Sequence, residues 1–130
     1  MSEWADPELL VGAWLRDTLS VKVWVDPKPP TNKWTTAPWL WVQRGQGGDT
    51  LALTLDDVLL DCDAYAANAD HARQLGQKAW AAMTLQLPKH TFSNGVFVTS
   101  STCFSRPAWA PDPQYRRAAA YRLILHSLIP

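Results

Sequence analysis

The chain has 130 residues, of which 47% are hydrophobic and 18% charged, and its twelve basic residues balance its twelve acidic ones. This length suits one domain spanning residues 1–130, and the composition excludes wholesale disorder. No run approaches the roughly 20 apolar residues of a membrane-spanning helix. Formal neutrality argues against tight DNA binding, which draws on a surplus of basic residues. We therefore expect one soluble domain.

The N-terminal residues predict a helix. The first six residues include acids where a secretory signal would place Lys or Arg, so we expect the protein to stay in a cytoplasm. Asp6 and Pro7 then mark a helix start, because aspartate caps helix N-termini and proline fits the first helical position. An apolar stripe at Val11, Trp14 and Leu15 predicts a helix of about three turns that packs on a sheet.

Two strands are predicted in the next part of the chain. Residues 21–25 alternate and are rich in β-branched side chains, and the prolines that follow end the strand and begin a long stiff loop through Trp34. Residues 39–44 form the second strand, with Trp39 and Trp41 on one face and Leu40 and Val42 on the other.

The middle of the chain predicts a glycine-rich turn and then an acidic strand. Residues 51–65 form one or two strands. Alternation places the apolar residues Val58, Leu60, Cys62 and Ala64 on one face, and the acids Asp57, Asp61 and Asp63 on the other.

A second helix and a hairpin complete the predicted elements. The helix spans about residues 68–87 and ends before Pro88; Gly76 lies in its apolar stripe and predicts close approach of another backbone. Residues 95–99 and 102–104 form a further strand, and residues 114–127 form the last one, connected by a proline-rich segment. Alanines 118–120 have helical propensity, but the alternation of Tyr121, Leu123 and Leu125 with polar residues favours a strand.

No residue pattern predicts catalysis, a cofactor or a metal site. The acids at 56, 57, 61 and 63 lack a converging histidine, and the three histidines have no metal-ligand spacing. The residues 100–103 offer hydroxyls and a thiol without the surroundings of a nucleophile elbow. Cys62 and Cys103 lie in apolar strands and are expected to be reduced, buried thiols. We expect a protein that is not an enzyme.

Tryptophan content and charge order both indicate a partner surface. Eight tryptophans exceed what so small a core can bury, and tryptophan is enriched at protein interfaces. Residues 49–70 hold six acids and no Lys or Arg, whereas residues 71–130 hold seven Lys or Arg and one acid. Such segregation suits a head-to-tail ring, in which two unlike patches meet. The alternative is that the fold interleaves the two segments and the charges cancel within one chain.

The order of these features resembles the tail terminator proteins of long-tailed siphophages, especially those of actinobacterial hosts. The resemblance extends from Pro7 to about Leu125 and depends on the layout and on two stretches, residues 57–83 and 107–125, the first opening with Asp-Val-Leu-Leu-Asp-Cys-Asp-Ala-Tyr-Ala. It implies an α+β fold, a mixed and mostly antiparallel sheet with two helices packed on one face, in a single domain.

The resemblance also implies a structural virion protein of the phage neck, assembled in the host cytoplasm. The chain would form a homo-hexameric ring that caps the tail tube and ends tube polymerisation. It would also join the tail to the head-completion or stopper protein. DNA would pass through the lumen without specific binding, and neither a cofactor nor a membrane is involved. The interface candidates are aromatic and charged residues: Trp34, Trp39, Trp41, Trp109, Asp57, Asp61, Asp63, Arg116, Arg117 and Arg122.

Two alternatives stay open. One is another neck adaptor, such as a head-completion or stopper subunit, which would share the size and the absence of chemistry. The other is a small ligand-binding or hydrolytic domain whose tryptophans line a pocket.

Overall fold

The structure is a computed structural model that describes residues 6–26, 38–45, 50–52, 55–109 and 115–126. Its elements, in chain order, are α1 (Pro7–Leu19), β1 (Lys22–Trp24), β2 (Trp39–Arg44), β3 (Thr50–Ala52), β4 (Leu55–Ala66), α2 (Ala69–Ala81), the π-helical turn η2 (Ala82–Gln86), β5 (Phe97–Trp109) and β6 (Tyr115–His126). The long loop predicted through Trp34 and most of the glycine-rich turn lie outside the described residues.

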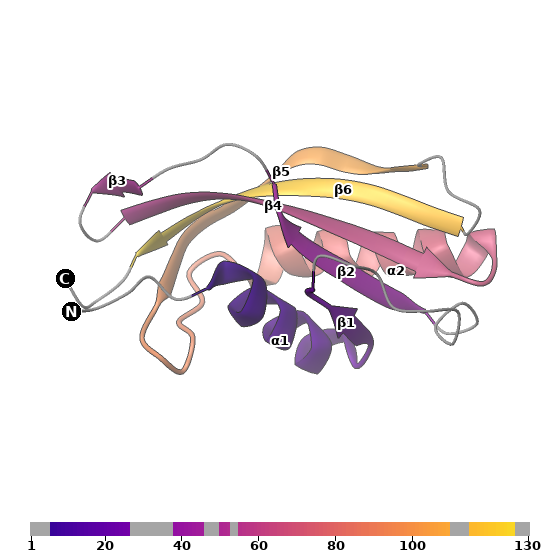
Figure 1. Cartoon of the computed structure of the whole chain (residues 1–130), viewed down its shortest axis with the longest axis horizontal. Helices are drawn as coiled ribbons and strands as arrows, with labels where there is room; N and C mark the ends of the chain where they lie inside the picture. The colour runs from indigo at the N-terminus through magenta and orange to yellow at the C-terminus, as the bar shows by residue number, and fades with distance from the viewer. Residues whose placement is uncertain (1–5, 27–37, 46–49, 53–54, 110–114, 127–130) are drawn as a thin grey trace.

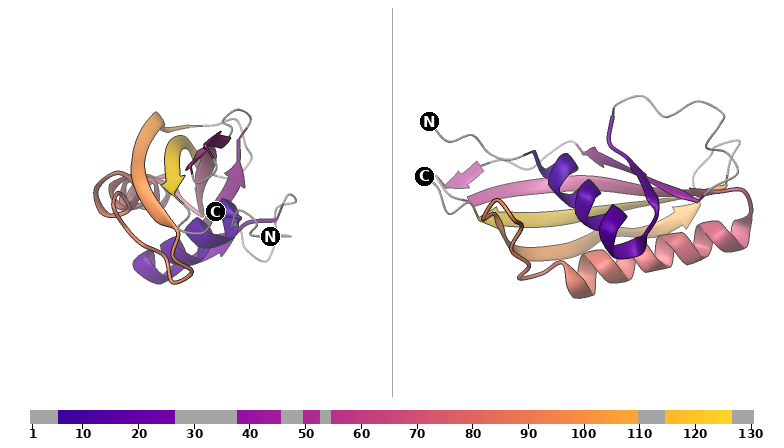
Figure 2. Two further views of the ribbon diagram at one scale, coloured as in Figure 1. Left: turned by 90° about the vertical axis from the view of Figure 1, so that its left-hand side faces the viewer. Right: turned by 90° about the horizontal axis from the view of Figure 1, so that it is seen from below.

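The strands form one six-stranded sheet in the order β1-β2-β4-β6-β5, with β3 paired to the start of β4. The β1–β2 pair is parallel and the other pairs are antiparallel. Both helices lie on the same side of the sheet (Figures 1 and 2). The predicted α+β domain, with a mixed and mostly antiparallel sheet and two helices on one face, is therefore confirmed.

The first helix begins and packs as its sequence predicts. The Asp6 carboxylate accepts a hydrogen bond of 2.9 Å from the Glu8 backbone N–H and so caps the helix. Val11 and Leu15 are fully buried against the sheet. A Cβ built at Gly12 would lie 2.7 Å from Val25 Cγ1, so this glycine lets the helix approach the chain that follows β1.

The second helix confirms the predicted start, and at Gly76 the atoms that come close are side-chain atoms and not the predicted second backbone. Asn68 caps it by accepting a hydrogen bond of 2.9 Å from the His71 backbone N–H. A Cβ at Gly76 would lie 3.3 Å from Cβ of Arg117 and 3.5 Å from Cβ of Pro107, so the helix sits close to β5 and β6. The last predicted turns are not α-helical, because residues 82–86 widen into a π-helix.

The core lies between the helices and the sheet face that the alternation predicted. Val58, Leu60, Cys62 and Ala64 of β4 are buried there, and β6 contributes the alternating set Ala119, Tyr121, Leu123 and Leu125. The strand prediction for residues 114–127 is thus confirmed. The further strand predicted from residues 95–99 and 102–104 is confirmed as β5, with bulges that break the sequence alternation. It extends to Trp109, so residues 106–109 belong to the strand and not to the predicted proline-rich connection.

The two cysteines are free, as predicted, but only Cys62 is buried. Burial, together with the neighbouring carboxylates of Asp63 and Asp61, raises the pKa of the Cys62 thiol to about 12. Cys103 is half-buried because it lies on β5, an edge strand of the sheet.

Candidate interaction surfaces

The face of the sheet that points away from the helices, here called the open face, combines apolar and charged side chains. On β4 this face carries the residues that alternate with the core residues. On β2 and β6 it carries the residues paired with those β4 positions. In the described part of the chain no helix covers this face. Its apolar members with partial exposure are Trp41, Leu55, Leu59, Ala118, Ala120 and Ile124.

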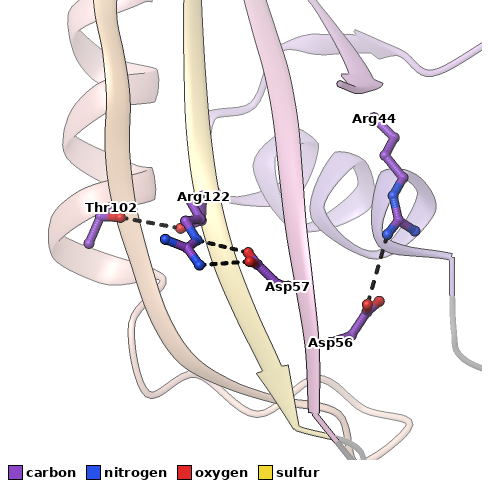
Figure 3. A network of polar contacts seen from close by, with 5 residues as sticks. All are labelled: Arg44, Asp56, Asp57, Thr102 and Arg122. Atoms are coloured by element: carbon purple, nitrogen blue, oxygen red, sulfur yellow. Dashed lines mark hydrogen bonds and ion pairs between the residues drawn. The ribbon is translucent and has the colours of Figure 1, made fainter. Parts of the chain in front are cut away.

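The first ion pair of the open face joins β4 to β6. The Arg122 guanidinium donates from Nε and Nη2 to the two carboxylate oxygens of Asp57, at 2.8 and 2.7 Å (Figure 3). This two-point geometry is the strong form of an arginine–carboxylate contact. The pKa of the Asp57 carboxyl is lowered, because hydrogen bonding to Arg122 lowers it by more than burial raises it. Asp56 points to the opposite face of the sheet, where its Oδ1 lies 3.8 Å from Nη2 of Arg44.

The second ion pair sits beside an aromatic stack. Arg116 donates from Nε and Nη2 to one oxygen of Asp63, at 3.0 and 2.7 Å. Its guanidinium also lies 5.7 Å from the centre of the Tyr65 ring, which stacks on Trp39 at 4.3 Å between ring centres. Here burial dominates and raises the pKa of the Asp63 carboxyl, against the opposing effect of Arg116.

Asp61 lies between these pairs on β4 and has no hydrogen bond or ion pair with any described residue. Its register neighbours are Gln43 on β2 and Ala120 on β6. It borders a hollow of about 260 Å³, here called the open-face hollow, whose remaining lining residues are Asp63, Ser105, Arg116, Ala118, Ala119 and Ala120. Partial burial raises the pKa of the Asp61 carboxyl, and Arg116 opposes that shift.

A second surface lies where α2 meets the C-terminal half of β5. The Trp109 ring is flanked by two guanidinium groups, those of Arg117 at 4.6 Å and Arg73 at 5.3 Å from the ring centre. Tyr115 meets Trp109 edge to face, with 6.2 Å between ring centres. We call this surface the arginine–aromatic patch; its residues are Arg73, Trp80, Arg106, Trp109, Tyr115 and Arg117.

The structure places the predicted interface residues in different surroundings, with Trp41 and Arg117 half-buried. Trp39 is only 2% exposed, and it packs within the chain. The acids and arginines that the sequence placed in opposite segments largely meet within one chain, as Asp57 with Arg122 and Asp63 with Arg116. Local cancellation, the alternative left open by the sequence, therefore holds for these four residues. Trp109 and Asp61 are exposed, whereas Trp34 lies outside the described residues.

Sequence reasoning missed Arg106, Tyr115 and the alanines that shape the hollow. Alternation along residues 116–122 could have indicated this surface, because it places two arginines and two alanines on one face: Arg116, Ala118, Ala120 and Arg122. Two arginines facing three aspartates leave one carboxylate without an arginine, and the observed ion pairs of the other two identify it as Asp61. The pairing of β4 with β6 is a tertiary property, which the sequence pattern alone does not supply.

Comparison with protein-family models and with curated proteins finds no match to this chain. Among the described residues, no three His, Cys, Asp or Glu side chains come together in a group that could hold a metal ion. Neither described helix has the length and apolar character needed to cross a membrane. The functional proposal therefore depends on the resemblance and on the surfaces described above.

Proposed function

We propose that this chain is the ring-forming subunit of a siphophage tail terminator. As a hexamer it would cap the tail tube, end tube polymerisation and join the tail to the head-completion complex. The proposal draws its layout from the resemblance of residues 57–83 and 107–125 to that family, and it is supported by the surfaces described above.

The observation that carries the proposal is the open face. A two-layer α+β domain buries one face of its sheet under helices, and the other face is ordinarily polar where it meets water. Here the open face carries partly exposed Trp41, Leu59 and Ile124 beside two arginine–carboxylate pairs. Exposed apolar groups mark surfaces that pack on other proteins, and tryptophan and arginine are enriched at such interfaces.

The charge of the chain fits passage of DNA through a ring. Twelve basic residues are balanced by twelve acidic ones. Each phosphate contact releases counterions and adds affinity, so a strongly basic lumen would retard DNA, whereas a neutral subunit avoids that retention.

The test has two parts. The mass of the purified chain under near-native conditions should be that of a hexamer, with rings in electron micrographs. Added to polymerising tail-tube protein, the chain should bind tube ends and stop elongation, and a matched amount of an unrelated protein of similar size should not. Binding to portal-side components without arrest of the tube would instead identify a stopper or another neck adaptor. A solitary chain that leaves tube growth unchanged would refute the proposal.

A further inference from the structure

The open face holds one more carboxylate than its arginines can satisfy. Asp57, Asp61 and Asp63 lie on this face of β4, and β6 supplies Arg122 to the first and Arg116 to the third. All three acids lie opposite uncharged β6 residues, which are Ile124, Ala120 and Ala118, so their ion pairs are diagonal. Because Arg122 pairs with Asp57 and Arg116 with Asp63, Asp61 is left without an ion pair among the described residues.

The missing partner leaves a hollow in its place. Ala118 and Ala120 form part of the lining of the open-face hollow, with Asp61 at its border. Gly45, the residue after β2, also lies near this carboxylate; a Cβ built there would make ordinary van der Waals contact with the two Asp61 carboxylate oxygens, at 3.5 and 3.6 Å. The hollow thus offers space and a negative charge at the same point, which suits a basic side chain from outside the chain.

The chain itself presents such a side chain on a different surface. Register on β5 shifts between Ser105 and Ala108, so Arg106 falls in a bulge without a β6 partner. Bulges commonly redirect a side chain in this way. Arg106 is exposed, its guanidinium lies 6.0 Å from the centre of the Trp80 ring, and no described carboxylate forms an ion pair with it.

The strand segment that carries Arg106, together with the start of β6, also carries exposed aromatic residues. Phe104 is 72% exposed, Tyr115 50% and Trp109 44%, and all three lie on the C-terminal half of β5 or the first residue of β6. Phenylalanine, tyrosine, tryptophan and arginine are the residue types enriched where proteins meet. Arg106 and Trp109 lie against the α2 residues Trp80 and Arg73, whereas the hollow lies on the face away from the helices, so the two surfaces differ.

We propose that Arg106 of one copy enters the open-face hollow of the next copy and pairs with Asp61, while the exposed rings around Arg106 cover the apolar residues of that open face. Because two unlike surfaces meet, the contact is head-to-tail, and repetition with a suitable rotation closes a ring. This inference rests on the proposed function, since it describes the contact between neighbouring subunits of that ring.

A charge-swap mixing experiment tests the contact. The variant Asp61→Arg loses the acid of the open-face hollow. The variant Arg106→Asp loses the arginine that is proposed to enter it. Each variant alone should lose about tenfold or more in ring formation, because like charges then face each other. An equimolar mixture should recover rings, since alternating copies make one native and one reversed Arg–Asp pair. Arg16→Asp, a matched charge change on the exposed face of α1, should leave assembly unchanged.

Native mass spectrometry reads out all four proteins and the mixture, and circular dichroism checks that each variant is folded. Recovery only in the mixture supports the contact. Rings formed equally well by either single variant, or a mixture that stays unassembled, would overturn it while leaving the terminator proposal in place. A wild-type chain that never assembles would instead overturn the ring itself.

Discussion

Replacing Asp57 by Asn should reveal how much the ion pair between β4 and β6 stabilises the domain. The Asp57 side chain is 12% exposed and that of Arg122 is 52% exposed. Opposite charges in contact attract each other, and the water around the half-exposed guanidinium screens that attraction. We expect the coupling to exceed that of an ion pair whose two side chains are both largely exposed.

A double-mutant cycle isolates that coupling. Asp57→Asn, Arg122→Met and the double variant are unfolded in urea at about pH 7, and the free energies of unfolding are compared. The pH dependence supplies a second readout. The folded-state pKa of Asp57 lies below its ordinary value of 3.8, so its stabilisation is complete above that value and disappears as pH falls through the folded-state pKa. The difference between wild type and Asp57→Asn should shrink correspondingly in acid.

Arg16 and Asp17 form the matched control, because their contact of 3.2 Å joins two largely exposed side chains on α1. The same cycle there should give about 0.5 kcal/mol or less. A coupling for Asp57 and Arg122 no larger than this control, or a difference that persists at low pH, would show that the pair contributes nothing specific to the fold.

Three further predictions concern the core. Gly12→Ala should destabilise the fold more than Gly76→Ala, because the new Cβ would meet Val25 Cγ1 at 2.7 Å in the first case and no atom closer than 3.3 Å in the second; thermal unfolding of both variants checks the order. Tyr121→Phe should raise the free energy of unfolding by about 1 kcal/mol in urea titrations, because the buried hydroxyl has no hydrogen-bond partner among the described residues, and a loss of stability would contradict this. Iodoacetamide should label Cys62 only at the rate of unfolding, measured by mass spectrometry, since burial raises the pKa of that thiol to about 12; rapid labelling of the native protein would be inconsistent with its burial.

The periodicity of the sequence determined the elements of the fold. Asp6 and Pro7 predicted the start of α1 through capping chemistry that acts within one helical turn. Alternation in residues 57–64 separated the core residues from the acids because side chains of a strand point to opposite faces. The same reasoning distinguished strand from helix for residues 118–125, despite the helical propensity of three alanines.

Register and bulges were decided only by the tertiary structure. The sequence showed acids before residue 71 and bases after it, but pairing β4 with β6 brought Asp57 to Arg122 and Asp63 to Arg116. Charge segregation along a chain therefore became local cancellation, since antiparallel pairing joins residues that are far apart in sequence. The same pairing of strands leaves Asp61 without an arginine, and a bulge in β5 leaves Arg106 without a β6 partner. Both consequences depend on which strands lie side by side, and no local pattern encodes that.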